Sequence, residues 1–110
     1  MRSARQPVNV KSVTNPHHMP TFRNAPVDLV VDVRSHLEYW LGHLPEAVCI
    51  PVNSIVEDLP KRPGVTTDSR ILVYCGSGAR SANAAEMLKS IGFKRVVDGG
   101  GIEQARHGLA

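Results

Sequence analysis

The chain has only two cysteines, Cys49 and Cys75, among its 110 residues. Two cysteines are too few for a disulfide-rich scaffold, and neither belongs to a C-x-x-C pair. The spacing of cysteines and histidines offers no zinc site, and the isolated pair His17 and His18 is interpreted as a loop feature. We therefore expect no metal or other cofactor, and each cysteine must be either a core residue or a nucleophile.

Long apolar runs are also missing. No stretch approaches the roughly 20 apolar residues that span a bilayer, and residues 1–25 contain no apolar segment of a secretory signal. We therefore expect a cytoplasmic protein without a membrane partner.

Charge of either sign is spread evenly. The net charge is +3 and the sequence pI is about 9.2, but no run of Lys and Arg and no alternation of basic and aromatic residues occurs. We therefore expect no nucleic-acid partner. The small excess of positive charge is compatible with a small anionic substrate.

The length fits one domain. Four of the eight prolines fall within residues 1–26, which argues against a long helix there. We expect residues 1–26 to form an N-terminal arm that can hold a short edge strand at residues 8–10, and residues 27–110 to form the domain.

Strands and helices alternate through that domain. Apolar, β-branched runs predict strands at residues 29–33, 47–50, 71–74 and 95–97. Helices are expected from Ser35 to Gly42, where Ser35 and Glu38 have the spacing of a capping box, and at 52–59, 80–91 and after 99–101. A core-facing stripe is expected at helical spacing in the third helix: Ala84, Met87, Leu88 and Ile91. This order predicts an α/β fold with a largely parallel sheet.

The informative segment begins where the third strand ends. Its residues are Cys75, Gly76, Ser77, Gly78, Ala79, Arg80 and Ser81. Glycines and small side chains let a backbone curl tightly, so its N–H groups and the first turn of the next helix can form an anion-binding cradle. Arg80 adds a permanent positive charge at the rim.

This loop favours Cys75 as a nucleophile. A free thiol is only a few per cent ionised at pH 7, whereas a helix N-terminus lowers the pKa of a cysteine and stabilises the thiolate. We expect the sulfur to be surrounded by inward-facing amides and open to solvent. Cys49 lies inside an apolar strand and is interpreted as core packing.

At these residues the chain resembles the rhodanese family over roughly residues 28–109. The matching pieces are Asp32-Val33-Arg34, Glu38-Tyr39, the segment from Gly42 to Ala47, Cys75 with Gly78, Arg80 and Ser81, and the segment from Gly99 to Glu103. Each piece alone is weak, but all occur in order at sensible spacing.

The resemblance implies a three-layer fold with a central, mostly parallel, five-stranded sheet flanked by helices. It also implies a sulfurtransferase in which Cys75 takes a sulfur from thiosulfate or a persulfide donor. The Cys75 persulfide would then pass that sulfur to cyanide or a thiol, which could belong to a protein. The backbone from Gly76 to Ser81 would hold the donor.

Two alternatives stay open. One is a sulfur-relay or regulatory module that loads sulfur but turns over slowly. The other is a small phosphatase or arsenate reductase, although similar folds with those activities carry C-x5-R where Cys75 to Arg80 is C-x4-R. One extra residue adds up to about 3.5 Å of chain, so the shorter loop favours sulfur over a tetrahedral oxyanion.

Two further side chains are given supporting roles. Asp32 and Arg34 could orient the loop or recognise the donor, but we favour a structural pairing between them or with backbone groups. His43 is interpreted as a structural histidine. Ala105 stands where the family usually has Trp, and its small size is expected to loosen the packing near the loop.

Overall fold

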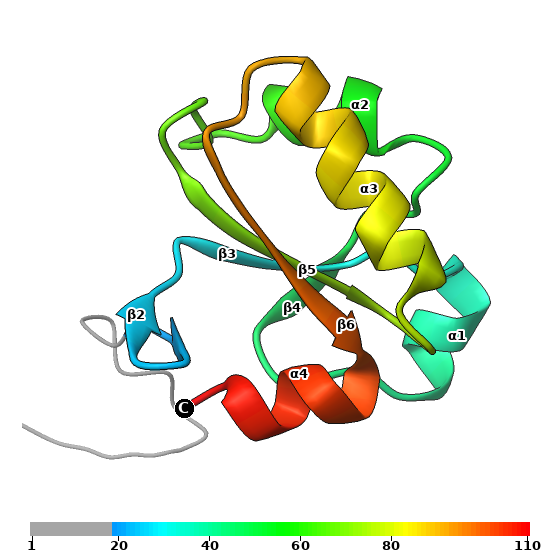
Figure 1. Ribbon diagram of the computed structural model, residues 1–110. Coiled ribbons are helices and arrows are strands. Elements are labelled where there is room, and N and C mark those ends of the chain that lie inside the picture. Colours follow the sequence, from blue (N-terminus) through cyan, green and yellow to red (C-terminus); the bar gives the residue numbers. More distant parts are fainter. Residues whose placement is uncertain (1–18) are drawn as a thin grey trace, which may run out of the picture.

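The computed structural model describes residues 19–110, and a four-stranded parallel sheet runs through it (Figure 1). Its strands are β3 (Leu29–Asp32), β4 (Ala47–Cys49), β5 (Arg70–Cys75) and β6 (Arg95–Gly101), in the order β4-β3-β5-β6. The helical elements are α1 (His36–Leu41), α2 (Ile55–Asp58), the 3-10 turn η1 (Leu59–Lys61), α3 (Ala79–Ser90) and α4 (Ile102–Gly108).

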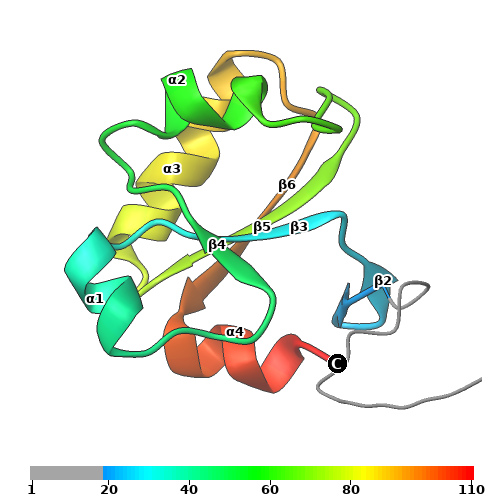
Figure 2. The same ribbon diagram turned by 180° about the vertical axis from the view of Figure 1, so that it is seen from behind.

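Helices cover both faces of the sheet, so its central strand is buried on both sides. Along β5, Ile71, Val73 and Cys75 pack with the cluster beneath α2 and α3. Leu72 and Tyr74 pack with the opposite cluster, which contains residues of α4 and of the N-terminal hairpin. Figure 2 shows α3 and α4 on opposite sides of the sheet. The predicted three-layer α/β architecture is therefore confirmed.

The expected number of five strands is wrong for the main sheet. The segment before β3 instead forms an antiparallel hairpin of β1 (Thr21–Phe22) and β2 (Ala25–Pro26). Arg23 and Asn24 have φ angles of 51° and 69°, which match the tight two-residue turn of a hairpin. Phe22 bridges to Leu109, so the hairpin packs on the chain end and does not extend the sheet. The expected strand at 8–10 lies outside the described residues.

Several boundaries differ from expectation for local reasons. β5 continues through Cys75, and β6 continues through the three glycines at 99–101, which were expected to form a link. Pro60 lies inside η1, because the first turn of a helix needs no proline N–H. On α3, Ala84 and Leu88 are buried, and Ala85 and Ser81 complete the buried stripe. The helix ends at Ser90, so Ile91 lies beyond it and is 40% exposed.

Ala105, the small residue expected to loosen the packing, lies between α4 and β6. Its side chain is fully buried, and a β-carbon on Gly99 would lie 3.4 Å from the Ala105 β-carbon. The small residue therefore allows α4 to lie close against β6. None of the helices in the described part of the chain is long and apolar enough to cross a membrane.

The last residue of β6 supports the loop after β5 through a close backbone approach. A β-carbon added at Gly101 would lie 2.6 Å from the carbonyl oxygen of Gly76. We therefore expect Gly101→Ala to displace the loop, to destabilise the fold by about 1–3 kcal/mol, and to lower the Tm by several degrees in thermal denaturation. The control Asn83→Ala changes an exposed residue of α3; an equal Tm for both variants would contradict the close approach.

Candidate active site

The carboxyl end of β5 places Cys75 at the edge of the sheet, and α3 begins four residues later at Ala79. Between them the chain reverses through Gly78, whose φ of 107° lies in the left-handed region. A side chain there would be strained. This reversal turns the first N–H groups of α3 back toward the end of the strand.

Two backbone N–H groups donate to the sulfur of Cys75. The distance from Gly78 N to Cys75 Sγ is 3.0 Å, and that from Ser81 N to Cys75 Sγ is 3.3 Å. The Ser81 hydroxyl lies within hydrogen-bond distance of the carbonyl oxygens of Gly78 and Gly100, at 3.0 and 3.3 Å, which holds the loop against β6. Within the described residues, the N–H groups of Ser77 and Ala79 have no hydrogen-bond partner, so they are available to an anion.

These contacts decide the ionisation of Cys75. Burial raises the pKa of the thiol, but hydrogen bonds from Ser81 and Gly78 favour the thiolate, and the net effect lowers the pKa below its ordinary value. Donors that point at a buried anion are the arrangement that stabilises developing negative charge in catalysis. The site can therefore hold a charged sulfur where water cannot solvate it.

The expectation that this sulfur is open to solvent is wrong. Cys75 is only 1% exposed, because it packs in the cluster beneath α2 and α3 and the amides of the loop lie against its sulfur. Gly76, Ser77 and Ala79 are the exposed residues of this segment.

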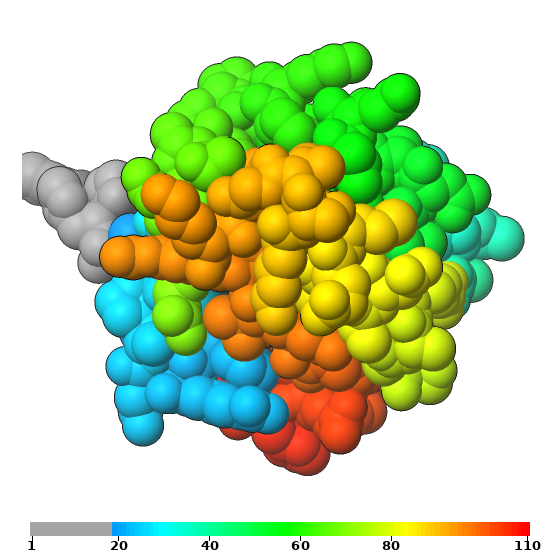
Figure 3. All heavy atoms as spheres, turned by 45° about the horizontal axis from the view of Figure 1, so that its top comes forward, coloured from blue at the N-terminus to red at the C-terminus, as the bar shows by residue number. Residues whose placement is uncertain are grey.

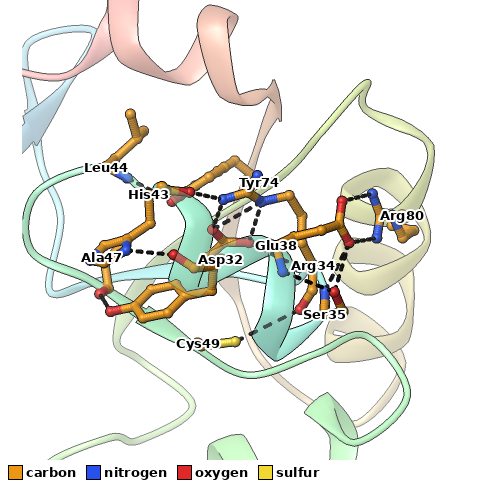
Figure 4. A network of polar contacts seen from close by, with 12 residues as sticks. Asp32, Arg34, Ser35, Glu38, His43, Leu44, Ala47, Cys49, Tyr74 and Arg80 are labelled. Atoms are coloured by element: carbon orange, nitrogen blue, oxygen red, sulfur yellow. Dashed lines mark hydrogen bonds and ion pairs between the residues drawn. The ribbon is translucent and has the colours of Figure 1, made fainter.

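Arg80 is held at the rim by an ion pair that the sequence did not indicate. Its guanidinium donates to both carboxylate oxygens of Glu38 on α1, at 2.7 and 3.1 Å (Figure 4). Hydrogen bonding from Arg80, with help from the Ser35 backbone, lowers the pKa of Glu38 to about 2. The capping box of Ser35 and Glu38 was predicted and is confirmed, but no local signal links Glu38 to a residue 42 positions away.

Asp32 and Arg34 pair with each other, as the structural interpretation expected. The Asp32 carboxylate is fully buried, and Arg34 Nη2 lies 2.7 Å from Asp32 Oδ2. Arg34 also donates to the carbonyl oxygen of Gly42, and the hydroxyl of Tyr74 accepts from the N–H of Leu44 at 3.0 Å. Figure 4 shows that this network joins the end of β3, β5 and the turn after α1. It positions α1, and with it Glu38, beside the loop.

Cys49 and His43 lie apart from the loop. Cys49 is half-buried, so it is less buried than a core residue, and its sulfur lies 3.8 Å from the carbonyl oxygen of Arg34. Contrary to expectation, it has charged neighbours, Asp32 and Arg34. Burial, followed by the charge of Asp32, raises the pKa of the Cys49 thiol, which keeps it neutral. The ring of His43 stacks on the ring of Tyr39 with centroids 3.7 Å apart, and His43 Nδ1 forms a hydrogen bond with the backbone carbonyl of Tyr39. These contacts give His43 the structural role that was expected.

The comparison with protein families agrees with this geometry. The family model of the rhodanese-like domain matches residues 19–104. The chain belongs to the rhodanese-like domain family. This rhodanese domain also resembles solved structures over most of its described length.

Two solved structures illustrate the likeness. One is a rhodanese with anions from E. coli, with a TM-score of 0.65 and 28% identity, covering 69% of this chain and 88% of that one. Another is a human single-domain sulfurtransferase, with a TM-score of 0.58 and 25% identity, covering 66% of this chain and 75% of that one.

The curated relatives of similar sequence are named for a different activity from that of these two structures. A tRNA uridine(34) hydroxylase of Sodalis glossinidius is 35% identical over 105 residues, and one of Escherichia coli O1:K1 / APEC is 38% identical over 86 residues. The alignments cover 91% and 74% of this chain, but only 30% and 25% of those proteins. The rhodanese domain therefore spans less than a third of the length of these relatives.

The opposite pKa directions of the two cysteines can be measured separately. In Cys49→Ser, we expect thiolate ultraviolet absorbance from Cys75 to appear below the ordinary pKa of about 8.5; in Cys75→Ser, absorbance from Cys49 should appear above it. Because the folded pKa of Cys75 is lowered, its contribution to stability is complete above the unfolded pKa and is lost as the pH falls through the folded value. A Cys75 titration at or above 8.5 would contradict the role of the amides.

The buried ion pair of Asp32 and Arg34 should contribute far more to the free energy of unfolding than an exposed ion pair does. Arg34→Met keeps much of the side-chain volume but leaves the buried Asp32 carboxylate without its cation, so we expect a loss of about 3 kcal/mol in urea denaturation. The control Arg106→Met breaks an exposed pair with Glu103 and should cost less than about 1 kcal/mol. Equal losses would show that Asp32 does not depend on Arg34.

Proposed function

We propose that this rhodanese domain is a sulfurtransferase that moves a sulfane sulfur through a persulfide on Cys75. The observation that carries the proposal is the pair of N–H donors on Cys75 Sγ. These donors stabilise the Cys75 thiolate before it attacks the sulfur donor, and again when it is the leaving group in the second step.

The reaction has two displacement steps. The Cys75 thiolate attacks the outer sulfur of thiosulfate, the sulfur–sulfur bond of the donor breaks, and sulfite leaves with the bonding electron pair. Cyanide or a thiolate then attacks the outer sulfur of the Cys75 persulfide, and the Cys75 thiolate leaves, which gives thiocyanate or a new persulfide. Each step conserves charge, and no outside oxidant is needed. The scheme is a ping-pong covalent mechanism.

The charge at the rim bears on the choice of donor. Thiosulfate carries two negative charges, whereas Arg80 is the only cationic side chain within residues 75–81 and is already paired with Glu38. Free N–H groups of Ser77 and Ala79 can still bind an oxyanion. The pairing of Arg80 supports a less highly charged persulfide donor alongside thiosulfate.

The length of the loop argues against phosphate chemistry. In this loop the Gly78 and Ser81 N–H groups lie within hydrogen-bond distance of the sulfur itself. A tetrahedral oxyanion bonded to Cys75 would need those donors one atom further out. The compact loop therefore supports sulfur transfer over a phosphatase or arsenate reductase.

The relatives support a second candidate, in which this domain is a sulfur-relay module with slow turnover of its own. Proteins named tRNA uridine(34) hydroxylase contain a matching segment as only 25–30% of their length. Under this candidate Cys75 still loads with sulfur, but small acceptors discharge it slowly and a larger partner accelerates discharge.

Intact mass tests the proposal directly. After incubation with thiosulfate we expect a gain of one sulfur atom (about 32 Da) that cyanide reverses. The gain should persist in Cys49→Ser and vanish in Cys75→Ser. A gain that depends on Cys49 would overturn the assignment.

Turnover then separates the alternatives. Steady thiocyanate formation from thiosulfate and cyanide supports the transferase, whereas loading without turnover supports the relay module. Hydrolysis of a phosphate ester without any sulfur loading would instead support a phosphatase.

A further inference from the structure

We infer that the outer face of α1 is the docking site for a transient protein partner whose cysteine exchanges sulfur with Cys75. This inference rests on the proposed function and names the partner class of the same site. The face consists of Leu37, Trp40 and Leu41 and is called the α1 patch below.

The α1 patch is apolar and uncovered. Leu37, Trp40 and Leu41 are 65%, 78% and 71% exposed, and none of the six residues of α1 is buried. At 3.6 residues per turn these three side chains share one side of the helix. Tyr39 occupies the opposite side, where its hydroxyl donates to the Ala47 carbonyl at 2.6 Å.

The α1 patch lies on the helix that contacts the Cys75 loop. Glu38, on the same helix, holds Arg80 of the Cys75 loop by the ion pair at 2.7 Å. Figure 3 shows α1, in cyan, at the edge of the molecule beside the yellow-green start of α3. A molecule seated on the patch would therefore lie beside the ion pair of Glu38 and Arg80 at the rim of the Cys75 loop.

The size of the patch favours a transient partner over a stable second copy. The three side chains together expose on the order of 400 Å², about half of the roughly 800 Å² that each side of a stable interface usually buries. Short-lived redox and signalling encounters use smaller contacts. A carrier that delivers or removes one sulfur must also leave after each exchange.

The composition of α1 argues against other occupants. Its sequence, from His36 to Leu41, contains no Lys or Arg and one carboxylate, whereas RNA and anionic membranes are bound through clusters of basic residues. A ridge of three side chains would also enclose little of a small molecule. An apolar protein segment that carries a thiol fits both the surface and the chemistry.

The exchange is balanced. The partner thiolate attacks the outer sulfur of the Cys75 persulfide, the bond between that sulfur and Cys75 Sγ breaks, and the Cys75 thiolate leaves with the electron pair. The partner becomes the persulfide and keeps the outer proton if one was present. In the reverse direction a partner persulfide loads Cys75.

The test compares two short peptides that contain one central cysteine. In the first, leucine and phenylalanine flank the cysteine; in the second, serines replace them. The protein carries Cys49→Ser, so that Cys75 is the single thiol. After loading with thiosulfate, we expect the apolar peptide to discharge Cys75 at least about fivefold faster than the serine peptide at low concentration.

Substitutions locate the preference on the surface. Trp40→Gln should reduce the ratio between the two peptides toward one, while discharge by cyanide stays within about twofold. The matched control Ile91→Gln changes an exposed apolar residue just after the end of α3 and should leave the ratio intact. The docking site would be overturned if the two peptides discharged Cys75 at nearly equal rates in the protein without Trp40→Gln, or if the preference for the apolar peptide persisted in Trp40→Gln.

Other occupants have their own signatures. If sedimentation analysis finds a dimer that Trp40→Gln dissociates, the patch belongs to a second copy and the inference is overturned. The inference is also overturned if the protein binds a uridine-containing RNA oligonucleotide and Trp40→Gln abolishes that binding. Failure of Cys75 to load with sulfur would overturn the proposed function as well, whereas loading and cyanide discharge without peptide preference would overturn only the docking site.

Discussion

The structure depends on the hydrogen bonds that Gly78 and Ser81 donate to the sulfur of Cys75. A buried thiolate is costly without such donors, because burial alone raises the pKa of a thiol. Here the donors prevail and the pKa falls. Three atoms come into contact here: the sulfur of Cys75 and the backbone nitrogens of Gly78 and Ser81. They are brought together by the end of β5, the left-handed turn at Gly78 and the start of α3.

The rest of the site keeps this contact in place. Gly101 admits the backbone of Gly76 at close range, and the Ser81 hydroxyl fastens the loop to the end of β6. From the other side, Glu38 holds Arg80, and the buried pair of Asp32 and Arg34 fixes the helix that carries Glu38. Residues far apart in the sequence thus act through packing on one short loop, and few of them need to touch a substrate.

Local patterns predicted the parts of the fold that local physics determines. The apolar runs marked all four strands of the main sheet, the capping box marked α1, and the glycines with Arg80 marked the loop after Cys75. Long-range features were beyond such patterns: the ion pair of Glu38 with Arg80 joins residues 42 positions apart. The burial of the sulfur and the hairpin at Arg23 and Asn24 also depend on packing that no short motif encodes.

Amide resonances of the loop, followed by NMR as Cys75 is converted to its persulfide, test the central claim most directly. If the loop holds the reactive sulfur by its amides, the signals of Gly78 and Ser81 should move most when the outer sulfur is added and return when cyanide removes it. Persulfide formation that leaves both signals in place would contradict the account, since the sulfur would then react without the donors that define the site.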